Sequence, residues 1–154
     1  KRENLDIYIK NNSRWSIGTA SIKEIEKYNI LKASLLAMRR AIKKLQKKPT
    51  LVLIDGNKTP ILKGYKLKFI IKGDQKIPEI SAASIIAKVA RDKLIKKISK
   101  KYKGYFWDQN AGYGTNKHLK AIRKLGITKY HRKKFKPVYN MLRVVKSHTQ
   151  IKYK

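Results

Sequence analysis

The sequence predicts a single α/β domain, because short β-branched apolar runs alternate with long segments of helical periodicity. Residues 50–54 form a continuous apolar run of strand length, and residues 65–71 form a second strand-like segment. Apolar residues recur every three or four positions over residues 31–45 and 81–100, which is typical of helices. Strands that alternate with helices favour an α/β domain, and 154 residues suit one domain.

The first elements are expected to be a strand and a long helix. Residues 15–22 alternate apolar and small polar side chains, which predicts a strand. Pro49 ends the helix that follows, because proline disfavours helical geometry at the residue before it. Five apolar residues share one face of that helix: Leu31, Leu35, Met38, Ile42 and Leu45.

The remaining elements are expected between residues 50 and 126. The strand over 50–54 favours parallel pairing, because it is apolar throughout. In the third expected helix, Thr115 is the N-cap and Gly126 the C-terminal stop. We assign residues 1–140 to the domain and 141–154 to a basic tail. The helix over 81–100 presents a narrow face of Ala83, Ala87, Ala90, Leu94 and Ile98.

The charge of the chain suggests a polyanionic partner. Lys and Arg total 40 against 9 Asp and Glu, which gives a net charge of +31 and points towards nucleic acid. A compositional bias towards Lys, Ile and Asn in the source explains the same excess, and both explanations stay open. The absence of cysteine excludes disulfides, a thiolate nucleophile and Cys-ligated zinc. We expect a cytoplasmic protein without a membrane partner, because neither a leader nor a long apolar run is visible. We also expect a monomer.

Two carboxylates are candidates for a metal site. Asp55 directly follows the first expected apolar strand, and Asp74 follows the next one. The carboxyl ends of parallel strands gather ligands, and two carboxylates suit a hard cation such as Mg²⁺. Ordinary turn chemistry is the alternative, because Asp-Gly and Gly-Asp both mark turns. The three histidines are far apart in the sequence, which argues against zinc.

The segment Ala111-Gly-Tyr-Gly-Thr115 is a candidate for nucleic-acid contact. Glycines on both sides of Tyr113 leave its ring on a flexible turn, where it could stack on a sugar or base. The alternative is a turn whose tyrosine folds back onto the core. Nearby basic residues are candidate phosphate ligands, or simply a solvated charge run: Lys117, Arg132, Lys133, Lys134 and Lys136.

Five motifs occur in order along the chain. They are Leu53-Ile-Asp-Gly-Asn57, Lys72-Gly-Asp74, Ile80-Ser-Ala-Ala-Ser-Ile-Ile-Ala-Lys-Val-Ala-Arg-Asp92, Gly112-Tyr-Gly-Thr115 with His118, and His131-Arg-Lys-Lys-Phe-Lys-Pro-Val138. The helix motif Ser-Ala-Ala-Ser is the most specific of them. Together, over residues 1–138, these motifs resemble bacterial type 2 ribonuclease H, also called ribonuclease HII.

The resemblance implies a ribonuclease H-like mixed sheet flanked by helices, with a C-terminal helical segment. It implies an endonuclease that uses Mg²⁺ or Mn²⁺, by a two-metal mechanism, on RNA–DNA hybrids or on ribonucleotides embedded in duplex DNA. Cleavage would occur on the 5′ side of the ribonucleotide. Asp55 and Asp74 match the family's third and fourth acidic residues, and Tyr113 matches its sugar-reading tyrosine. The remaining substrate-binding candidates are Gly112, Thr115, Arg132 and Lys133.

The sequence departs from the family at its N-terminus. The family's first two acidic residues lie in an Asp-Glu-Ala-Gly-Arg-Gly motif that is absent here, as are the first strands. We therefore expect the parent to be an active nuclease and this 154-residue chain to be inactive and poorly folded alone. Ala111 stands where the family commonly has a basic residue. The alternatives are a non-enzymatic basic RNA-binding protein of ribosomal type and a catalytically dead paralogue.

Overall fold

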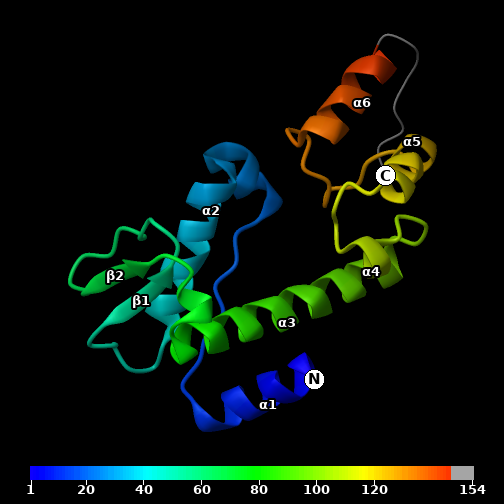
Figure 1. The fold of residues 1–154 in the computed structure, drawn as a ribbon. Helices are drawn as coiled ribbons and strands as arrows, with labels where there is room; N and C mark the ends of the chain where they lie inside the picture. Colours follow the sequence, from blue (N-terminus) through cyan, green and yellow to red (C-terminus); the bar gives the residue numbers. More distant parts are fainter. Residues whose placement is uncertain (147–154) are drawn as a thin grey trace. The chain divides into compact units, whose positions relative to one another are not determined.

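The computed structural model describes residues 1–146 as two compact units, each of which is described here by itself. The N-terminal unit comprises Lys1–Ser21 and Tyr28–Ala90, and the C-terminal unit comprises Ile22–Lys27 and the chain from Arg91 onward. Figure 1 shows the elements in chain order: α1 (Arg2–Asn12), α2 (Ile22–Lys44), β1 (Val52–Asp55), β2 (Leu67–Ile70), the 3₁₀ turn η1 (Gly73–Gln75), α3 (Pro78–Lys101), α4 (Trp107–Asn110), α5 (Asn116–Leu125) and α6 (Lys136–Lys146).

The sheet of the described residues consists of β1 and β2, paired in parallel. The register aligns Val52 with Leu67 and Asp55 with Ile70, so the carboxyl ends of both strands lie side by side. A further hydrogen bond from the Gly56 amide to the Ile70 carbonyl, 3.0 Å long, extends the pairing past β1. The predicted α/β class and the parallel pairing are confirmed.

The strand expected over residues 15–22 is not formed. Residues 14–21 have no regular secondary structure and lie along α2 instead. The Ser16 hydroxyl donates to the Ala41 carbonyl at 2.5 Å, and the Arg40 guanidinium donates to the Thr19 carbonyl at 2.7 Å. A strand requires a neighbouring backbone to pair with, and the described partners of this segment come from a helix. The apolar alternation was therefore insufficient to predict a strand.

The two long helices expected from the sequence are confirmed, with earlier starts. Helix α2 begins at Ile22 and is kinked at Asn29, where φ is 69°. The Asn29 side chain accepts from the Lys32 amide at 3.0 Å, which caps the second part of the helix. Helix α3 begins at Pro78, because proline is well suited to the first helical position. Four residues expected on the packed faces of these helices are exposed: Leu31, Ala83, Ala87 and Leu94.

Helix α1 was not expected from the sequence. It buries the carboxylate of Asp6, which is 1% exposed and pairs with the Lys10 ammonium one turn later at 2.8 Å.

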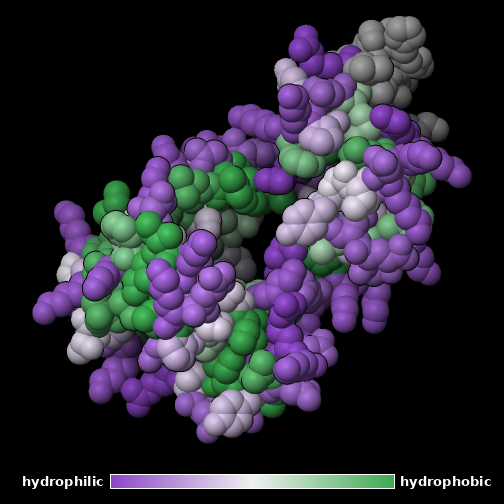
Figure 2. Space-filling view, in the orientation of Figure 1, coloured by the Kyte–Doolittle hydropathy of each residue, from purple (hydrophilic) through white to green (hydrophobic). Residues whose placement is uncertain are grey.

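Hydrophobic residues are visible on the surface of the N-terminal unit (Figure 2). Around the sheet, Leu51, Phe69 and Ile71 are half exposed or more. The unit thus carries exposed apolar side chains in and next to its two strands.

An aromatic core organises the C-terminal unit. Tyr105 and Trp107 stack with ring centroids 5.2 Å apart, and Val138 of α6 joins the same core. Thr115 caps α5 by accepting the His118 amide, and Gly126 follows its last residue, as expected. The boundary assigned between residues 140 and 141 falls within α6, and residues 147–154 lie outside the described residues. No helix within residues 1–146 is long and apolar enough to cross a membrane.

Candidate functional site

Asp55 and Asp74 lie at the same edge of the two-stranded sheet. Asp55 is the last residue of β1, and its Oδ1 accepts the Gly73 amide hydrogen at 2.8 Å. Gly73 opens η1, which Ile71 and Lys72 separate from β2, and Asp74 is the next residue. Both aspartates are exposed, so a ligand can reach their carboxylates from solvent. The parallel pairing predicted from the sequence therefore places the two candidate metal ligands at one edge of the sheet.

Gly73 fixes the orientation of the Asp55 carboxylate, a role the sequence did not reveal. A Cβ at Gly73 would lie 2.6 Å from Ile80 Cδ1 and 3.3 Å from Ile70 Cβ. A side chain at this position would press on Ile80 and Ile70, which favours glycine where the amide approaches the end of β1. In the sequence, the signal for this role is the glycine between Lys72 and Asp74.

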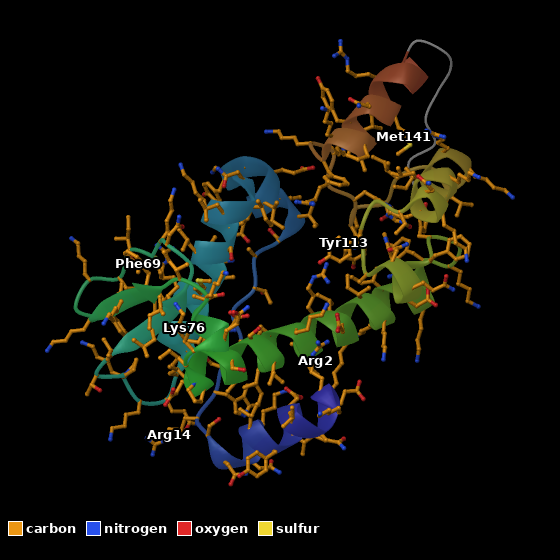
Figure 3. The ribbon with its side chains drawn as sticks, in the orientation of Figure 1. Arg2, Arg14, Phe69, Lys76, Tyr113 and Met141 are labelled. Carbon is orange, nitrogen blue, oxygen red and sulfur yellow. The ribbon has the colours of Figure 1, made fainter. Side chains whose placement is uncertain are left out.

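Basic residues surround this edge of the sheet. The Lys76 ammonium, labelled in Figure 3, donates to the Ile71 carbonyl at 3.0 Å. Lys72, which precedes Gly73, is exposed and adopts a left-handed conformation. Positive charge beside two carboxylates suits a phosphate-containing substrate, because lysines attract the phosphate while the carboxylates remain available for a cation.

The carboxylate edge fits a hard divalent cation in part. Oxygen donors are the ligands that Mg²⁺ and Mn²⁺ prefer, and both aspartates supply them. Among the described residues, no group of three His, Cys, Asp or Glu side chains converges on one point. Asp55 and Asp74 could therefore bind a cation that keeps several waters, and a two-metal site would require further ligands.

The second candidate site is the loop around Tyr113 in the C-terminal unit. The buried Asn110 side chain donates to the Tyr105 carbonyl at 2.9 Å and accepts the Gly112 amide at 2.8 Å. The Tyr113 amide donates to the Asn110 carbonyl at 2.8 Å. Tyr113 itself is 65% exposed, so its ring does not fold back onto the core. The loop is thus a fixed backbone that carries an accessible aromatic ring.

Arg91 of α3 also contacts this loop, a contact that was not expected from the sequence. Its Nη2 donates to the Ala111 carbonyl at 2.8 Å, and its guanidinium carbon lies 5.7 Å from the centroid of the Tyr113 ring. Arg91 stands more than twenty residues before Tyr113, so no local spacing relates the two. Only the folded C-terminal unit brings them together.

The other substrate-binding candidates have structural partners. The Thr115 hydroxyl accepts the His118 amide at 3.3 Å, and the Arg132 guanidinium lies 4.9 Å from the centroid of the Phe135 ring. The Lys133 amide donates to the Glu26 carboxylate at 2.5 Å, and Lys133 is an exposed residue. Their contact with substrate stays a prediction, as does that of Gly112.

Two histidines that are distant in the sequence stack in the core of the C-terminal unit. The rings of His118 and His131 lie 5.3 Å apart between centroids, at 17°. His118 Nδ1 lies 2.8 Å from the Tyr105 carbonyl, and His131 Nδ1 accepts the Thr128 amide at 2.9 Å. Their distance in the sequence gave no indication of this contact, which the fold of the C-terminal unit creates. His148 lies outside the described residues.

Burial lowers the pKa of the His131 imidazole in the C-terminal unit. Removal from water, together with the nearby positive form of His118, lowers the pKa of His131 to about 4. Burial also lowers the pKa of His118, an effect that its contact with the Tyr105 carbonyl opposes. Both rings are therefore neutral in the folded unit at neutral pH.

We expect the C-terminal unit to lose stability between pH 6.5 and pH 4. In this range the unfolded chain protonates His131, whose ordinary pKa is 6.5, whereas the folded unit does not. The contribution is fully present above pH 6.5 and falls by about 3 kcal/mol as the pH approaches 4. Urea unfolding at several pH values measures it. His131→Asn, which keeps an acceptor for the Thr128 amide, should flatten the dependence; an unchanged slope would contradict this assignment.

Comparison with known proteins identifies close relatives. The family model for ribonuclease HII matches residues 2–138. A ribonuclease HII from Pelagibacter ubique is 69% identical over 142 residues, covering 92% of this chain and 76% of the relative. A ribonuclease HII from Roseobacter denitrificans is 48% identical over 127 residues, covering 82% of this chain and 64% of the relative.

A solved structure shares the fold. The crystal structure of the ribonuclease H2 from Pyrococcus horikoshii OT3 matches with a TM-score of 0.64 at 20% identity, covering 80% of this chain and 66% of that chain. Across these relatives, the chain spans between 64% and 76% of the length of the protein that it matches.

Proposed function

The chain belongs to the ribonuclease HII family, and from this we propose that it forms part of a metal-dependent endonuclease. Its substrates would be RNA–DNA hybrids and duplex DNA with embedded ribonucleotides, cut on the 5′ side of the ribonucleotide. The observation that carries the proposal is the pair of aspartates at one sheet edge, where the Gly73 amide holds Asp55 next to Asp74. We further propose a cytoplasmic monomer.

The aspartates would act through a divalent cation. When bound, Mg²⁺ or Mn²⁺ supplies an activated water and neutralises charge that develops on the phosphate and the leaving oxygen. Asp55 and Asp74 would provide carboxylate oxygens to it, and the Gly73 amide would keep the Asp55 carboxylate in one orientation. The lysines at this edge would hold the phosphate backbone without reading its sequence.

Tyr113 would recognise the ribonucleotide. Its exposed ring offers a flat surface on a loop whose backbone is fixed by Asn110. The strength of stacking between an aromatic ring and a sugar or base depends on where the nucleotide lies. The 2′-hydroxyl distinguishes a ribonucleotide from a deoxyribonucleotide at that place. Arg132 and Lys133 would add phosphate contacts from the same unit. This division of roles separates recognition of the ribose from hydrolysis of the phosphodiester.

We expect the 154-residue chain alone to cleave slowly at best. The family uses four acidic residues, and the described sheet edge supplies two, Asp55 and Asp74. A metal with too few protein ligands binds weakly and positions its water poorly. Binding of nucleic acid relies on other groups, so it should persist in this chain.

Replacing Tyr113 by alanine should remove the preference for a ribonucleotide. A base–aromatic stack is worth about 1–3 kcal/mol, so the preference for a one-ribonucleotide duplex over an all-DNA duplex should fall about tenfold. Tyr113→Phe should keep most of it. Fluorescence anisotropy with both duplexes in EDTA measures the two dissociation constants without cleavage.

Tyr139→Ala is the matched control for this experiment, because Tyr139 is also exposed and lies in the same unit. It should leave the preference unchanged. If the unaltered chain binds both duplexes equally, the proposed recognition role of Tyr113 is wrong.

A further inference from the structure

We propose that Arg91 is a positioning residue that orients the Tyr113 ring for recognition of the ribonucleotide, an inference that rests on the proposed function. Arg91 bridges the loop and the ring. One nitrogen of its guanidinium donates to the Ala111 carbonyl at 2.8 Å, and the group lies 5.7 Å from the Tyr113 ring centroid. One side chain thus contacts both the backbone and the aromatic ring of the loop.

The Arg91 contact falls on an unfavourable backbone conformation at Ala111. Ala111 has a φ of 47° and a ψ of 30°, a left-handed conformation that is unfavourable for a residue with a Cβ. Its amide donates to the Trp107 carbonyl at 2.9 Å, which ends α4. The Arg91 guanidinium binds the carbonyl of the same residue. Arg91 therefore holds the peptide that directs the chain into Gly112 and Tyr113.

The Tyr113 ring needs a separate restraint. The hydrogen bonds to Asn110 fix the main chain of Gly112 and Tyr113 but leave the tyrosine side-chain torsions unrestrained. A Cβ at Gly112 would have no atom within 4 Å, so this side of the loop is open. A cation near one face of an aromatic ring attracts it through the ring quadrupole. Arg91 is thus placed to favour one ring orientation and to leave the other face for a nucleoside.

Arginine suits this position better than lysine. The guanidinium is planar and has several donors, so it can donate to a carbonyl while its face remains near a ring. A lysine ammonium is a compact charge that cannot satisfy both geometries at once. Arg91→Lys therefore keeps the positive charge but restrains the Tyr113 ring less well.

A double-mutant cycle between Arg91 and Tyr113 tests the proposal. The measured quantity is the ratio of dissociation constants of the 154-residue chain for the all-DNA and the one-ribonucleotide duplex, in EDTA. Arg91→Ala should lower this ratio severalfold, and Arg91→Lys should lower it less. Combining Arg91→Ala with Tyr113→Ala should lower it no further than Tyr113→Ala alone, because both residues act through the same ring.

Arg143→Ala is the matched control, because the Arg143 guanidinium lies 5.8 Å from the Tyr139 ring centroid elsewhere in the same unit. It removes an equal charge and should leave the ratio unchanged. In the free chain, ¹H–¹³C resonances of the Tyr113 ring should shift in Arg91→Ala while those of Tyr105 in the core stay in place. This second readout shows that the variant remains folded.

Each of the following outcomes would overturn the proposal. If Arg91→Ala weakens binding of both duplexes equally, Arg91 contacts phosphate and does not orient the ring. If the two substitutions lower the ratio independently, they do not act through one ring. If Tyr113→Ala abolishes the preference and Arg91→Ala preserves it, only the role of Arg91 fails. If the unaltered chain has no preference for the one-ribonucleotide duplex, the recognition role of Tyr113 is overturned as well. The same holds if Tyr113→Ala keeps that preference.

Discussion

Asp55→Asn should reduce cleavage by about a thousandfold, to the limit of detection, in a chain that carries the family's N-terminal acidic segment. An amide binds a divalent cation more weakly than a carboxylate does, and it leaves the phosphate charge uncompensated. Asp74→Asn should act similarly, because both carboxylates lie at the carboxyl ends of β1 and β2. Initial rates on a labelled duplex with one ribonucleotide measure the effect in Mg²⁺ and in Mn²⁺.

Nucleic-acid binding should survive the same substitutions. Removal of a negative charge beside the lysines of this edge should leave affinity unchanged or slightly higher. Asp108→Asn is the matched control, because Asp108 is exposed on α4, outside the candidate sites. Its rate should equal that of the unaltered chain. Cleavage retained in Asp55→Asn would show that this carboxylate does not hold the metal.

Gly18→Ala should destabilise the N-terminal unit by about 3 kcal/mol, because it overpacks a contact between backbones. A Cβ at Gly18 would lie 2.0 Å from the Ala37 carbonyl oxygen and 2.5 Å from the Ala41 amide nitrogen. Neither atom belongs to a flexible side chain, so the segment must move away from α2. That movement would also strain the hydrogen bond from Ser16 to Ala41.

Urea unfolding, followed by circular dichroism, measures this loss. Thr19→Ala is the control, because the Thr19 side chain is exposed and only its carbonyl bonds to Arg40. It should change the free energy of unfolding by less than about 0.5 kcal/mol. Equal effects of Gly18→Ala and Thr19→Ala would show that residues 14–21 do not pack on α2.

Helices α2, α3 and α5 could be predicted from the sequence because their determinants are local, whereas α1 was not expected. Thr115 and Gly126 mark the two ends of α5, and apolar periodicity marks α2 and α3. The strand over residues 15–22 could not be predicted reliably, because a strand depends on a partner elsewhere in the chain. The apolar alternation over residues 15–22 also fits an extended segment that packs on α2, with Gly18 at the point of contact.

The candidate sites could be predicted only where their residues follow an element directly. Asp55 ends β1 and Asp74 lies in η1 shortly after β2, so parallel pairing was enough to place them at one edge. The contact of Arg91 with Tyr113 and the stacking of His118 on His131 depend on tertiary packing. No spacing in the sequence encodes these contacts, which is why the sequence did not reveal them.

The most direct test of the proposed function is cleavage of a duplex that carries one ribonucleotide, with the cut position mapped on a denaturing gel. The chain is compared with a version that carries the family's Asp-Glu-Ala-Gly-Arg-Gly segment, with and without Mg²⁺ or Mn²⁺. We predict metal-dependent cleavage on the 5′ side of the ribonucleotide by the extended version, and little by the chain alone. Binding by both without cleavage by either would contradict the nuclease assignment and favour a nucleic-acid-binding protein or a catalytically dead paralogue.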